Sequence, residues 1–444
     1  MKAHAMCWVL FWLLAGCSRQ SDIVGTTEIT TWQYGKRGAI SITFDDGSIN
    51  QFRKAIPLLN DLGYKGTFFI ITGNIPGSTH EAKFVGRPLA EIVHESTVMP
   101  TNPANFFERA SAVAFLDIDS ALSYHTVAGS LFEAGRATDA YAQIDKGLAR
   151  AREGKRSLRP TTSTQNGITW EEIRTFARQG HEFGNHTVSH PRLAVLDEKN
   201  LLYELTMGKE ELLQHLGPYH TFSAECPYGT EDERVMEYAL KVHPALRNRM
   251  PEPFLEELNR WNEQSPSTST KPYVQWQRGP LGDTPMALMK SWIDTVVQGN
   301  NIWLVLVFHG VDGVGWEART SGELEEFFNY IKQYEDRLWV ETFGNVTRYM
   351  RERMNTTVKK YVDDEVITID LTHNLDPGLY SLPLTLKTYV GKDWKRATFR
   401  QGSETRRLTP IIDAKGMYVT YRVVPNSGPF QILEAGRGRE GIKG

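Results

Sequence analysis

Short apolar runs and amphipathic helical stretches alternate along most of the chain. The run from Ala39 to Phe44 is rich in β-branched residues and predicts a buried strand. A helical pattern follows from Ile49 to Leu62, and residues 65–71 predict a second strand. Capping boxes at 169–172 and 320–323 predict the starts of two further helices. This alternation of strands and helices predicts parallel βαβ units.

Two adjacent carboxylates close the first predicted strand, in the run Thr43-Phe44-Asp45-Asp46-Gly47. Like charges about 4 Å apart repel by roughly 1 to 4 kcal/mol, depending on the local dielectric. A chain keeps such a pair where a cation or a proton-transfer task needs it. The alternative is an Asx turn, because Asp-Gly is a common turn dipeptide.

A pair of histidines, His186 and His190, lies downstream in the run from Gly180 to Pro191. Imidazole and carboxylate groups are usual ligands of zinc-like ions, and catalytic sites combine three protein ligands with one open position. Pro191 disfavours a helix at His190, so we expect the pair on a loop or short turn after a strand. The alternative is that both histidines are surface or capping residues.

Together the two runs resemble the first two motifs of the polysaccharide deacetylases, carbohydrate esterase family four: Thr-Phe-Asp-Asp-Gly and His-[Ser/Thr]-x-x-His. The resemblance implies three metal ligands, which are Asp46, His186 and His190. It implies zinc as the divalent metal, or cobalt or a similar ion, and Asp45 as the general base. It also implies a distorted (β/α) barrel, in agreement with the motifs' positions at predicted strand ends.

The apolar strand Leu304 to Phe308, which ends at His309, resembles the fifth motif of the family. The resemblance implies that His309 is the general acid and that Val307 lies near the pocket for the acetyl methyl group. A histidine can return a proton to a leaving nitrogen or oxygen. The alternative for His309 is a structural histidine at a strand end.

The third motif departs from the family pattern, because Glu225 stands where an arginine usually orients the catalytic aspartate. The following Pro227 and Tyr228 match, which implies that Pro227 lines the substrate pocket and that the backbone N–H of Tyr228 is an oxyanion donor. A glutamate beside Asp45 would raise the pKa of Asp45. We therefore expect Glu225 to point away and another cation to support Asp45, with Arg278 as the candidate.

The fourth motif of the family, an aspartate beside a tryptophan, is not recognisable in this sequence. Asp283 stands at a suitable distance before His309 and is carried as a weak catalytic candidate. Trp276 and Trp292 are the nearest tryptophans, and Trp276 is carried as a weak candidate for the substrate pocket.

The predicted barrel covers residues 18–356 and is interrupted by an alanine-rich helical insert at 75–166. One stretch of the insert, 128–141, resembles a single tetratricopeptide-like hairpin. Because at least about three repeats are needed to bury a solenoid core, a lid over the site is favoured over a protein-binding array. A protein partner for the insert is the alternative.

After the barrel the pattern changes to short β-rich runs, which predict a small β-sandwich-like domain at 357–435. The glycine- and arginine-rich tail, 436–444, is expected to be disordered. With these boundaries, all candidate catalytic and metal-binding residues lie in the predicted barrel.

Residues 1–17 predict a targeting segment rather than structure. Its apolar stretch is too short to span a bilayer, and Leu14-Ala15-Gly16-Cys17 resembles a bacterial lipobox, which implies cleavage before Cys17 and lipidation of its thiol. Ser18 favours outer-membrane retention, and an ordinary secretory signal is the alternative. After processing, Cys226 is the one remaining free thiol. A net charge of −3 argues against nucleic acid as a partner.

The sequence thus predicts an exported lipoprotein of the outer membrane, periplasm or cell surface. It would be a metal-dependent hydrolase that removes acetyl groups, N-acetyl favoured, from a polysaccharide or peptidoglycan-type glycan. One alternative is a glycan-binding envelope lipoprotein with weak or no turnover. The others are an O-acetyl esterase and a small-molecule amidohydrolase on the same site.

Overall fold

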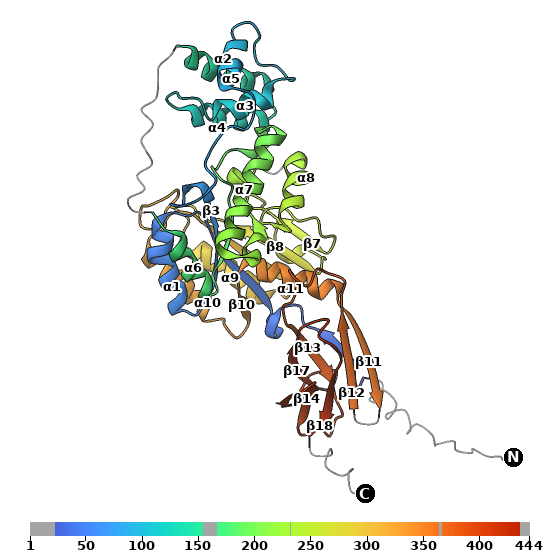
Figure 1. Ribbon diagram of the computed structural model, residues 1–444. Helices are drawn as coiled ribbons and strands as arrows, with labels where there is room; N and C mark the ends of the chain where they lie inside the picture. Colours follow the sequence, from blue (N-terminus) through green and yellow to red (C-terminus); the bar gives the residue numbers. More distant parts are fainter. Residues whose placement is uncertain (1–22, 154–166, 231, 364–365, 436–444) are drawn as a thin grey trace, which may run out of the picture. The chain divides into compact units, whose positions relative to one another are not determined.

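The computed structural model describes residues 23–153, 167–230, 232–363 and 366–435 (Figure 1). The predicted targeting segment, Cys17 and the predicted tail lie outside the described residues. The chain divides into two compact units, one of Lys36–Thr347 and one that joins the residues up to Gly35 with those from Arg348 onward. In the part of the chain described, no helix combines the length and the apolar character needed to cross a bilayer.

A curled sheet of parallel strands forms the centre of the larger unit. In spatial order its strands are β6 (Ala245–Leu246), β5 (Ser223–Ala224), β4 (Glu182–Asn185), β3 (Gly66–Ile70), β2 (Gly38–Asp46), β9 (Ile302–Phe308), β8 (Tyr273–Arg278) and β7 (Leu255–Leu258). β10 (Leu338–Val340) also pairs with β2. The order ends at β6 and β7 without closing, which confirms the predicted distorted (β/α) barrel.

Helices follow the strands, and most of them bury one face of the sheet; Phe343 of the last helix packs against Phe69 and Trp303 instead. They are α1 (Ile56–Asp61), α6 (Trp170–Arg178), α7 (Glu198–Leu216), α8 (Glu233–Val242), α9 (Met286–Gln298), α10 (Ser321–Lys332) and α11 (Phe343–Asn355). Both predicted capping boxes are formed, at Thr169 and at Thr320. Alternate residues of β2 and β9 enter the core under these helices, where the rings of Phe44 and Phe308 stack with centroids 5.3 Å apart.

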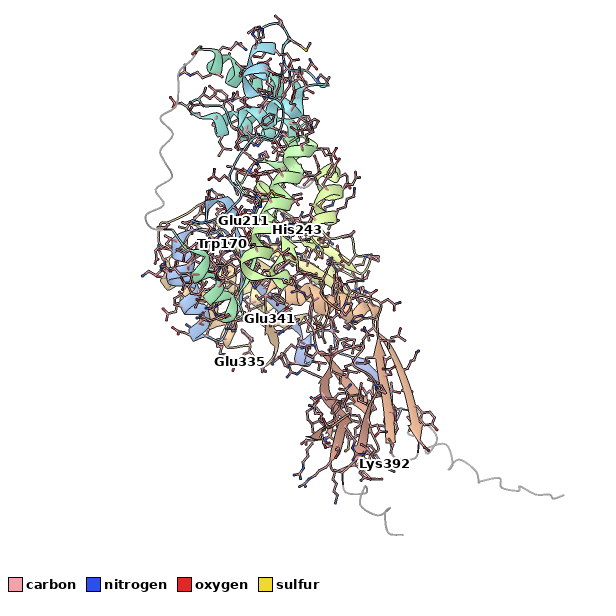
Figure 2. All side chains as sticks on the ribbon, viewed as in Figure 1. Trp170, Glu211, His243, Glu335, Glu341 and Lys392 are labelled. Atoms are coloured by element: carbon pink, nitrogen blue, oxygen red, sulfur yellow. The ribbon has the colours of Figure 1, made fainter. Side chains whose placement is uncertain are left out.

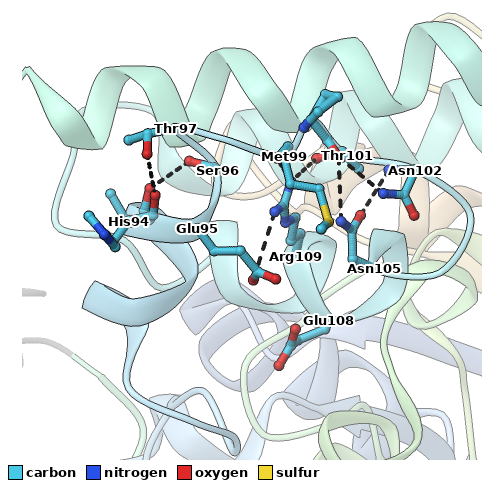
Figure 3. Close-up of polar contacts among 12 residues, drawn as sticks. His94, Glu95, Ser96, Thr97, Met99, Thr101, Asn102, Asn105, Glu108 and Arg109 are labelled. Atoms are coloured by element: carbon cyan, nitrogen blue, oxygen red, sulfur yellow. Dashed lines mark hydrogen bonds and ion pairs between the residues drawn. The ribbon is translucent and has the colours of Figure 1, made fainter.

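Between β3 and α6, the described residues form four α-helices that have an apolar core of their own. They are α2 (Leu89–Glu95), α3 (Phe106–Val113), α4 (Ala121–Glu133) and α5 (Ala137–Arg152). Figure 3 shows the buried Arg109 of α3 beside Glu95 and Thr101, where its guanidinium donates to the carbonyl of Met99 (2.9 Å) and to Oγ1 of Thr101 (3.3 Å). Val195, from the loop after the paired histidines, belongs to the same core.

The smaller unit contains two antiparallel sheets. One has the order β1 (Thr27–Ile29), β13 (Leu384–Tyr389), β17 (Met417–Val423), β16 (Ile411–Ile412). The other has the order β11 (Thr357–Asp363), β12 (Val366–Thr372), β18 (Phe430–Glu434), β14 (Ala397–Gln401), β15 (Glu404–Leu408). The sequence analysis placed residues 18–356 in the barrel, but β1 pairs with β13 instead. Pairing between such distant segments leaves no local pattern in a three-residue strand.

Candidate active site

The candidate residues gather at the carboxyl ends of β2, β4 and β9, with β3 between β4 and β2. Asp45 and Asp46 end β2, and the parallel register places Asp46 beside Ile70, the last residue of β3. Asn185, the last residue of β4, lies on the other side of Ile70. His309 follows the end of β9 directly. Parallel strands bring their carboxyl ends to one edge, which is where barrel proteins build their active sites.

Asp46, His186 and His190 converge at this edge. Nε2 of His186 lies 3.4 Å from Oδ1 of Asp46, and Nε2 of His190 lies 3.3 Å from the same oxygen. The three ligand atoms all lie within 4.8 Å of one another, close enough to share one ion. One carboxylate and two imidazoles, with room for a fourth ligand, form a donor set of the catalytic zinc type. The residues therefore fit the divalent metal that the sequence implied.

A buried carbonyl orients His186 toward the ion position. Nδ1 of His186 lies 2.9 Å from the carbonyl oxygen of Glu225. A carbonyl oxygen only accepts hydrogen bonds, so Nδ1 carries the proton and Nε2 keeps its lone pair for a metal. Such outer hydrogen bonds hold the tautomer and the ring orientation of metal ligands.

The loop between the two histidines has an unusual backbone, held in place by α7. Thr187 and His190 have φ values of 68° and 61°, in the left-handed region that residues other than glycine rarely adopt. Oε2 of Glu204 accepts hydrogen bonds from the N–H groups of Val188 (2.9 Å) and Ser189 (2.8 Å). The buried glutamate thus satisfies two successive amides of the strained loop.

Asn185 supports the same loop from the strand side. Its Oδ1 accepts from the N–H of Thr187 (2.9 Å), and its Nδ2 donates to Nε2 of His243 (2.9 Å). His243 is labelled in Figure 2. Burial lowers the pKa of His243 to about 4, so this histidine is neutral. Its Nδ1 then donates to the carbonyl of Thr221 (3.1 Å), which leaves Nε2 free to accept from Asn185.

Arg247, directly after β6, is the cation that holds Asp45. Its Nη1 and Nη2 donate to the two carboxylate oxygens of Asp45, both at 2.6 Å, and Nη1 also donates to Oγ1 of Thr43 (2.9 Å). The Arg247 side chain is 1 % exposed, so this bidentate pair is fully desolvated. Paired, planar geometry of this kind fixes the carboxylate plane as well as its charge.

Two expectations about the third motif are wrong. Glu225 does not point away: it is buried, and its Oε1 lies 2.8 Å from Nη2 of Arg247. Arg278 does not support Asp45, because its guanidinium donates to backbone carbonyls, including that of Asn262 at 3.0 Å. The parallel register of β5 and β6 explains the outcome, since it brings position 247 beside position 225. The arginine that supports Asp45 therefore follows β6 and does not stand at the third-motif position. Glu225, which stands at that position, is the second carboxylate that Arg247 contacts.

The pKa values of the acidic pair follow from these contacts. Burial raises the pKa of Asp45, but the Arg247 guanidinium, helped by His309, more than offsets burial and holds that pKa below its usual range. Burial raises the pKa of Glu225, and the nearby Asp45 carboxylate adds to the increase against the opposing effect of Arg247. Asp45 is therefore the ionised partner, as a general base requires.

His309 lies next to Asp45. Its Nε2 is 3.4 Å from Oδ2 of Asp45, and the indole of Trp316 meets its ring edge to face with centroids 4.6 Å apart. The carbonyl of His309 accepts a hydrogen bond from Nε2 of the buried Gln51 (2.8 Å). Burial lowers the pKa of His309; Asp45 opposes this, and the guanidinium of Arg247 adds to it.

These groups open into one cavity of about 470 Å³. Its lining residues are Asp45, Asp46, His186, His190, Arg192, Glu225, Tyr228, Gly229, Arg260, Trp261, His309 and Trp316. Sequence reasoning missed Arg192, Arg260, Trp261 and Trp316. One signal was available, because Arg192 directly follows the His-Pro end of the second motif.

The helical insert holds Arg192 in the cavity wall. The backbone N–H of Arg192 donates to Nε2 of His125 on α4 (3.0 Å), and its guanidinium forms an ion pair with Glu133 at the end of the same helix. The guanidinium also lies over the Tyr228 ring, 4.6 Å from its centroid. Gly129 of α4 makes room for this arrangement, since a Cβ there would lie 2.2 Å from Cδ of Arg192.

Four other candidate residues from the sequence analysis lie outside the cavity lining. Val307 is buried within β9 and Pro227 is buried before Tyr228. Trp276 lines a neighbouring cavity instead. Asp283 is exposed, because Arg319 binds the carbonyls on either side of it and turns the loop outward.

The fold and the geometry define the larger unit as a (β/α)-barrel domain with a metal-type centre at the carboxyl ends of its strands. Residues 33–93 and 117–243, less than half of the chain, match the family model described as polysaccharide deacetylase. His309 lies beyond the matched residues, so its assignment depends on the geometry above.

The chain is 26 % identical over 280 residues to a gellan lyase of Bacillus sp., an alignment that covers 59 % of this chain and 11 % of that protein. Among solved structures, a putative polysaccharide deacetylase from Mycobacterium smegmatis aligns at 12 % identity with a TM-score of 0.36, covering 74 % of this chain and 94 % of that one. A carbohydrate esterase domain of a xylanase from the hindgut metagenome of Trinervitermes trinervoides aligns at 11 % identity with a TM-score of 0.33, covering 70 % and 89 %.

Proposed function

We propose that this protein is a metal-dependent hydrolase that removes acetyl groups, N-acetyl in preference to O-acetyl, from a polysaccharide or peptidoglycan-type glycan. One observation carries the proposal: a three-residue metal-type cluster and an Asp45–His309 pair share one cavity. Zinc is the proposed ion, and cobalt is the alternative.

Residues of the chain would bind the ion and act as the general base and the general acid. A divalent ion held by Asp46, His186 and His190 would lower the pKa of water from 15.7 toward about 7 and polarise the acetyl carbonyl. Asp45 accepts the proton of the attacking water as the C–O bond forms. His309 gives a proton to the leaving nitrogen as the C–N bond breaks, which yields acetate and an amine. The backbone N–H of Tyr228, at the cavity wall, is the proposed donor to the oxyanion.

Arg247 weakens the case for a binding protein without turnover. That alternative rested on the loss of the third-motif arginine at Glu225. The bidentate contact of Arg247 with Asp45, at 2.6 Å for both bonds, supplies the same support from another strand. The base therefore retains the partner that orients it, which favours an active enzyme.

Acetate release is the direct test. Acetylated chitooligosaccharides, peptidoglycan and acetylated xylan would each be incubated with the protein, with and without a chelator, beside an Asp46→Ala control. We expect release from an N-acetylated substrate that the chelator abolishes and zinc restores. Absence of release from all three, with one metal bound per chain, would favour the glycan-binding alternative.

We further propose that the protein is exported and anchored in the envelope through a lipid on Cys17, which brings the barrel to its glycan. A Cys17→Ser variant should lose incorporation of labelled fatty acid and leave the membrane fraction. A wild-type protein that incorporates no label would instead indicate an ordinary secretory signal.

A further inference from the structure

A second cavity adjoins the metal cavity. Arg260 and Trp261 line both the metal cavity and a neighbouring cavity of about 560 Å³. Trp276, Trp292 and Arg278 lie in the wall of the second cavity. A glycan whose acetylated sugar lies at the metal cluster therefore has a built space for the next sugar along the chain.

Aromatic side chains are exposed around this double cavity. The indoles of Trp261 and Trp316 are 74 % and 51 % exposed, and the Tyr228 ring is 42 % exposed. Large exposed aromatics at a cavity rim are unusual in a structural role and typical of a binding surface. A flat ring beside a pocket of this size can accept the apolar C–H face of a sugar ring.

In the part of the chain described, the two arginines of the second cavity lack a direct ion pair, although Asp45 and Glu225 act on Arg260 electrostatically from the metal cavity. Arg247 and Arg192 each have a carboxylate partner. Among the described residues, neither Arg260 nor Arg278 forms an ion pair with a carboxylate. Arg260 lies over Trp261, with 5.7 Å from its guanidinium carbon to the ring centroid.

Among the described residues, the contacts of the Arg278 guanidinium are likewise with neutral groups. It donates to backbone carbonyls and lies over Trp276 at 4.5 Å. Glu263 is the one carboxylate among the lining residues of the second cavity, so two guanidiniums face one acidic group there. Guanidinium groups without a carboxylate partner in a concave site favour an anionic ligand, and their planar geometry matches a carboxylate.

We propose that the second cavity binds a sugar that carries a carboxylate, and hence that the substrate is an acidic, uronate-containing acetylated glycan. This inference rests on the proposed function. The acetylated sugar occupies the metal cavity, its acidic neighbour stacks on Trp261, and the carboxylate lies against Arg260 and Arg278. The net charge of −3 does not oppose this, because the two arginines act at contact distance rather than by long-range attraction.

A matched pair of ligands tests the inference. One is an oligosaccharide of alternating glucuronate and N-acetylglucosamine, and the other is the same oligosaccharide with its carboxylates reduced to alcohols. Calorimetry on chelator-treated protein, in which turnover is stopped, should show at least about tenfold tighter binding of the acidic form at low salt. The difference should shrink as salt is added, since part of the contact is exposed. Equal affinities would overturn the inference.

Variants of the two arginines test whether the preference for the acidic ligand arises in the second cavity. Arg260→Gln and Arg278→Gln should each lower the ratio of acidic to reduced affinity by at least about threefold, whereas the exposed Arg178→Gln on α6 should leave the ratio unchanged. With zinc restored, equal kcat/KM for the two forms overturns the inference and leaves the deacetylase proposal standing. Selective binding of the acidic form without acetate release overturns the deacetylase proposal alone.

Discussion

Replacement of Arg247 by methionine is the sharpest test of how this site is held together. The change keeps a long apolar side chain but removes the one cation that contacts both buried carboxylates. Asp45 and Glu225 have side chains only 4 % and 5 % exposed, so water cannot replace the lost guanidinium. The variant would therefore leave two buried carboxyl groups without the cation that keeps Asp45 ionised.

The expected effect is large. Unit charges about 4 Å apart attract by about 4 kcal/mol at an effective dielectric of 20, and removal of one partner from a buried pair typically costs about 3–5 kcal/mol. We expect the free energy of unfolding of the larger unit to fall by that amount at pH 7.5. Acetate release should fall by at least about 100-fold, because Asp45 loses its orientation and its ionised state.

The pH dependence distinguishes this cause from simple loss of packing. In the wild type, the pKa of Asp45 lies below its ordinary value, so its contribution to stability is present above that value and is lost as the pH falls through the folded pKa. Without Arg247 the pKa of Asp45 rises by about 1–3 units. The destabilisation should then shrink on acidification, and the acid limb of kcat/KM should move to higher pH.

Urea unfolding at pH 7.5 and pH 5 and pH–rate profiles measure both effects. Glu225→Gln in the Arg247→Met background is the matched control, since removal of one stranded carboxylate should restore part of the lost stability. The reasoning would be refuted if the free energy of unfolding of Arg247→Met lay within about 1 kcal/mol of the wild-type value at both pH values and the acid limb of kcat/KM did not move.

Three further outcomes are expected. Asp46→Ala should lose bound metal by elemental analysis, with acetate release lowered at least about 100-fold and not recovered by added zinc; full metal content would contradict the ligand assignment. Arg260→Gln removes one of the charges that lower the pKa of the general acid, so the alkaline limb of kcat/KM should move to higher pH; a shift to lower pH would be the wrong sign. Gly129→Ala places a methyl group against Arg192 and should raise KM several-fold, whereas Gly322→Ala, whose Cβ meets nothing within 4 Å, should leave KM unchanged.

The sequence was informative where local pattern determines structure. The apolar run before Asp45, the two capping boxes and the parallel alternation of strands and helices are short-range signals, and the barrel is built on them. The two aspartates and two histidines also came together as expected, because each follows the carboxyl end of a strand in one parallel sheet.

The rest of the site depends on contacts that leave no local trace. β6 is only two residues long, which is too short for a hydrophobic pattern that would predict a strand there. The position of Arg247 beside Glu225 could therefore not be predicted from the sequence. Arg260 and Trp316 lie on irregular connections after strands, where neither period nor propensity indicates direction. Asp283 was chosen by its distance along the chain, and the hydrogen bonds of Arg319 turn its loop to solvent.

Through its contacts with Arg192, α4 of the insert supports the wall of the cavity, although no described residue of the insert lines it. The insert has an apolar core of its own, so α4 can open locally while the barrel strands remain paired. Each such opening releases Arg192 from Glu133 and removes a section of the cavity wall. The amide exchange rate of α4 should therefore report how often the cavity loses its shape, and substitutions far from the metal cluster can change substrate affinity through that equilibrium alone.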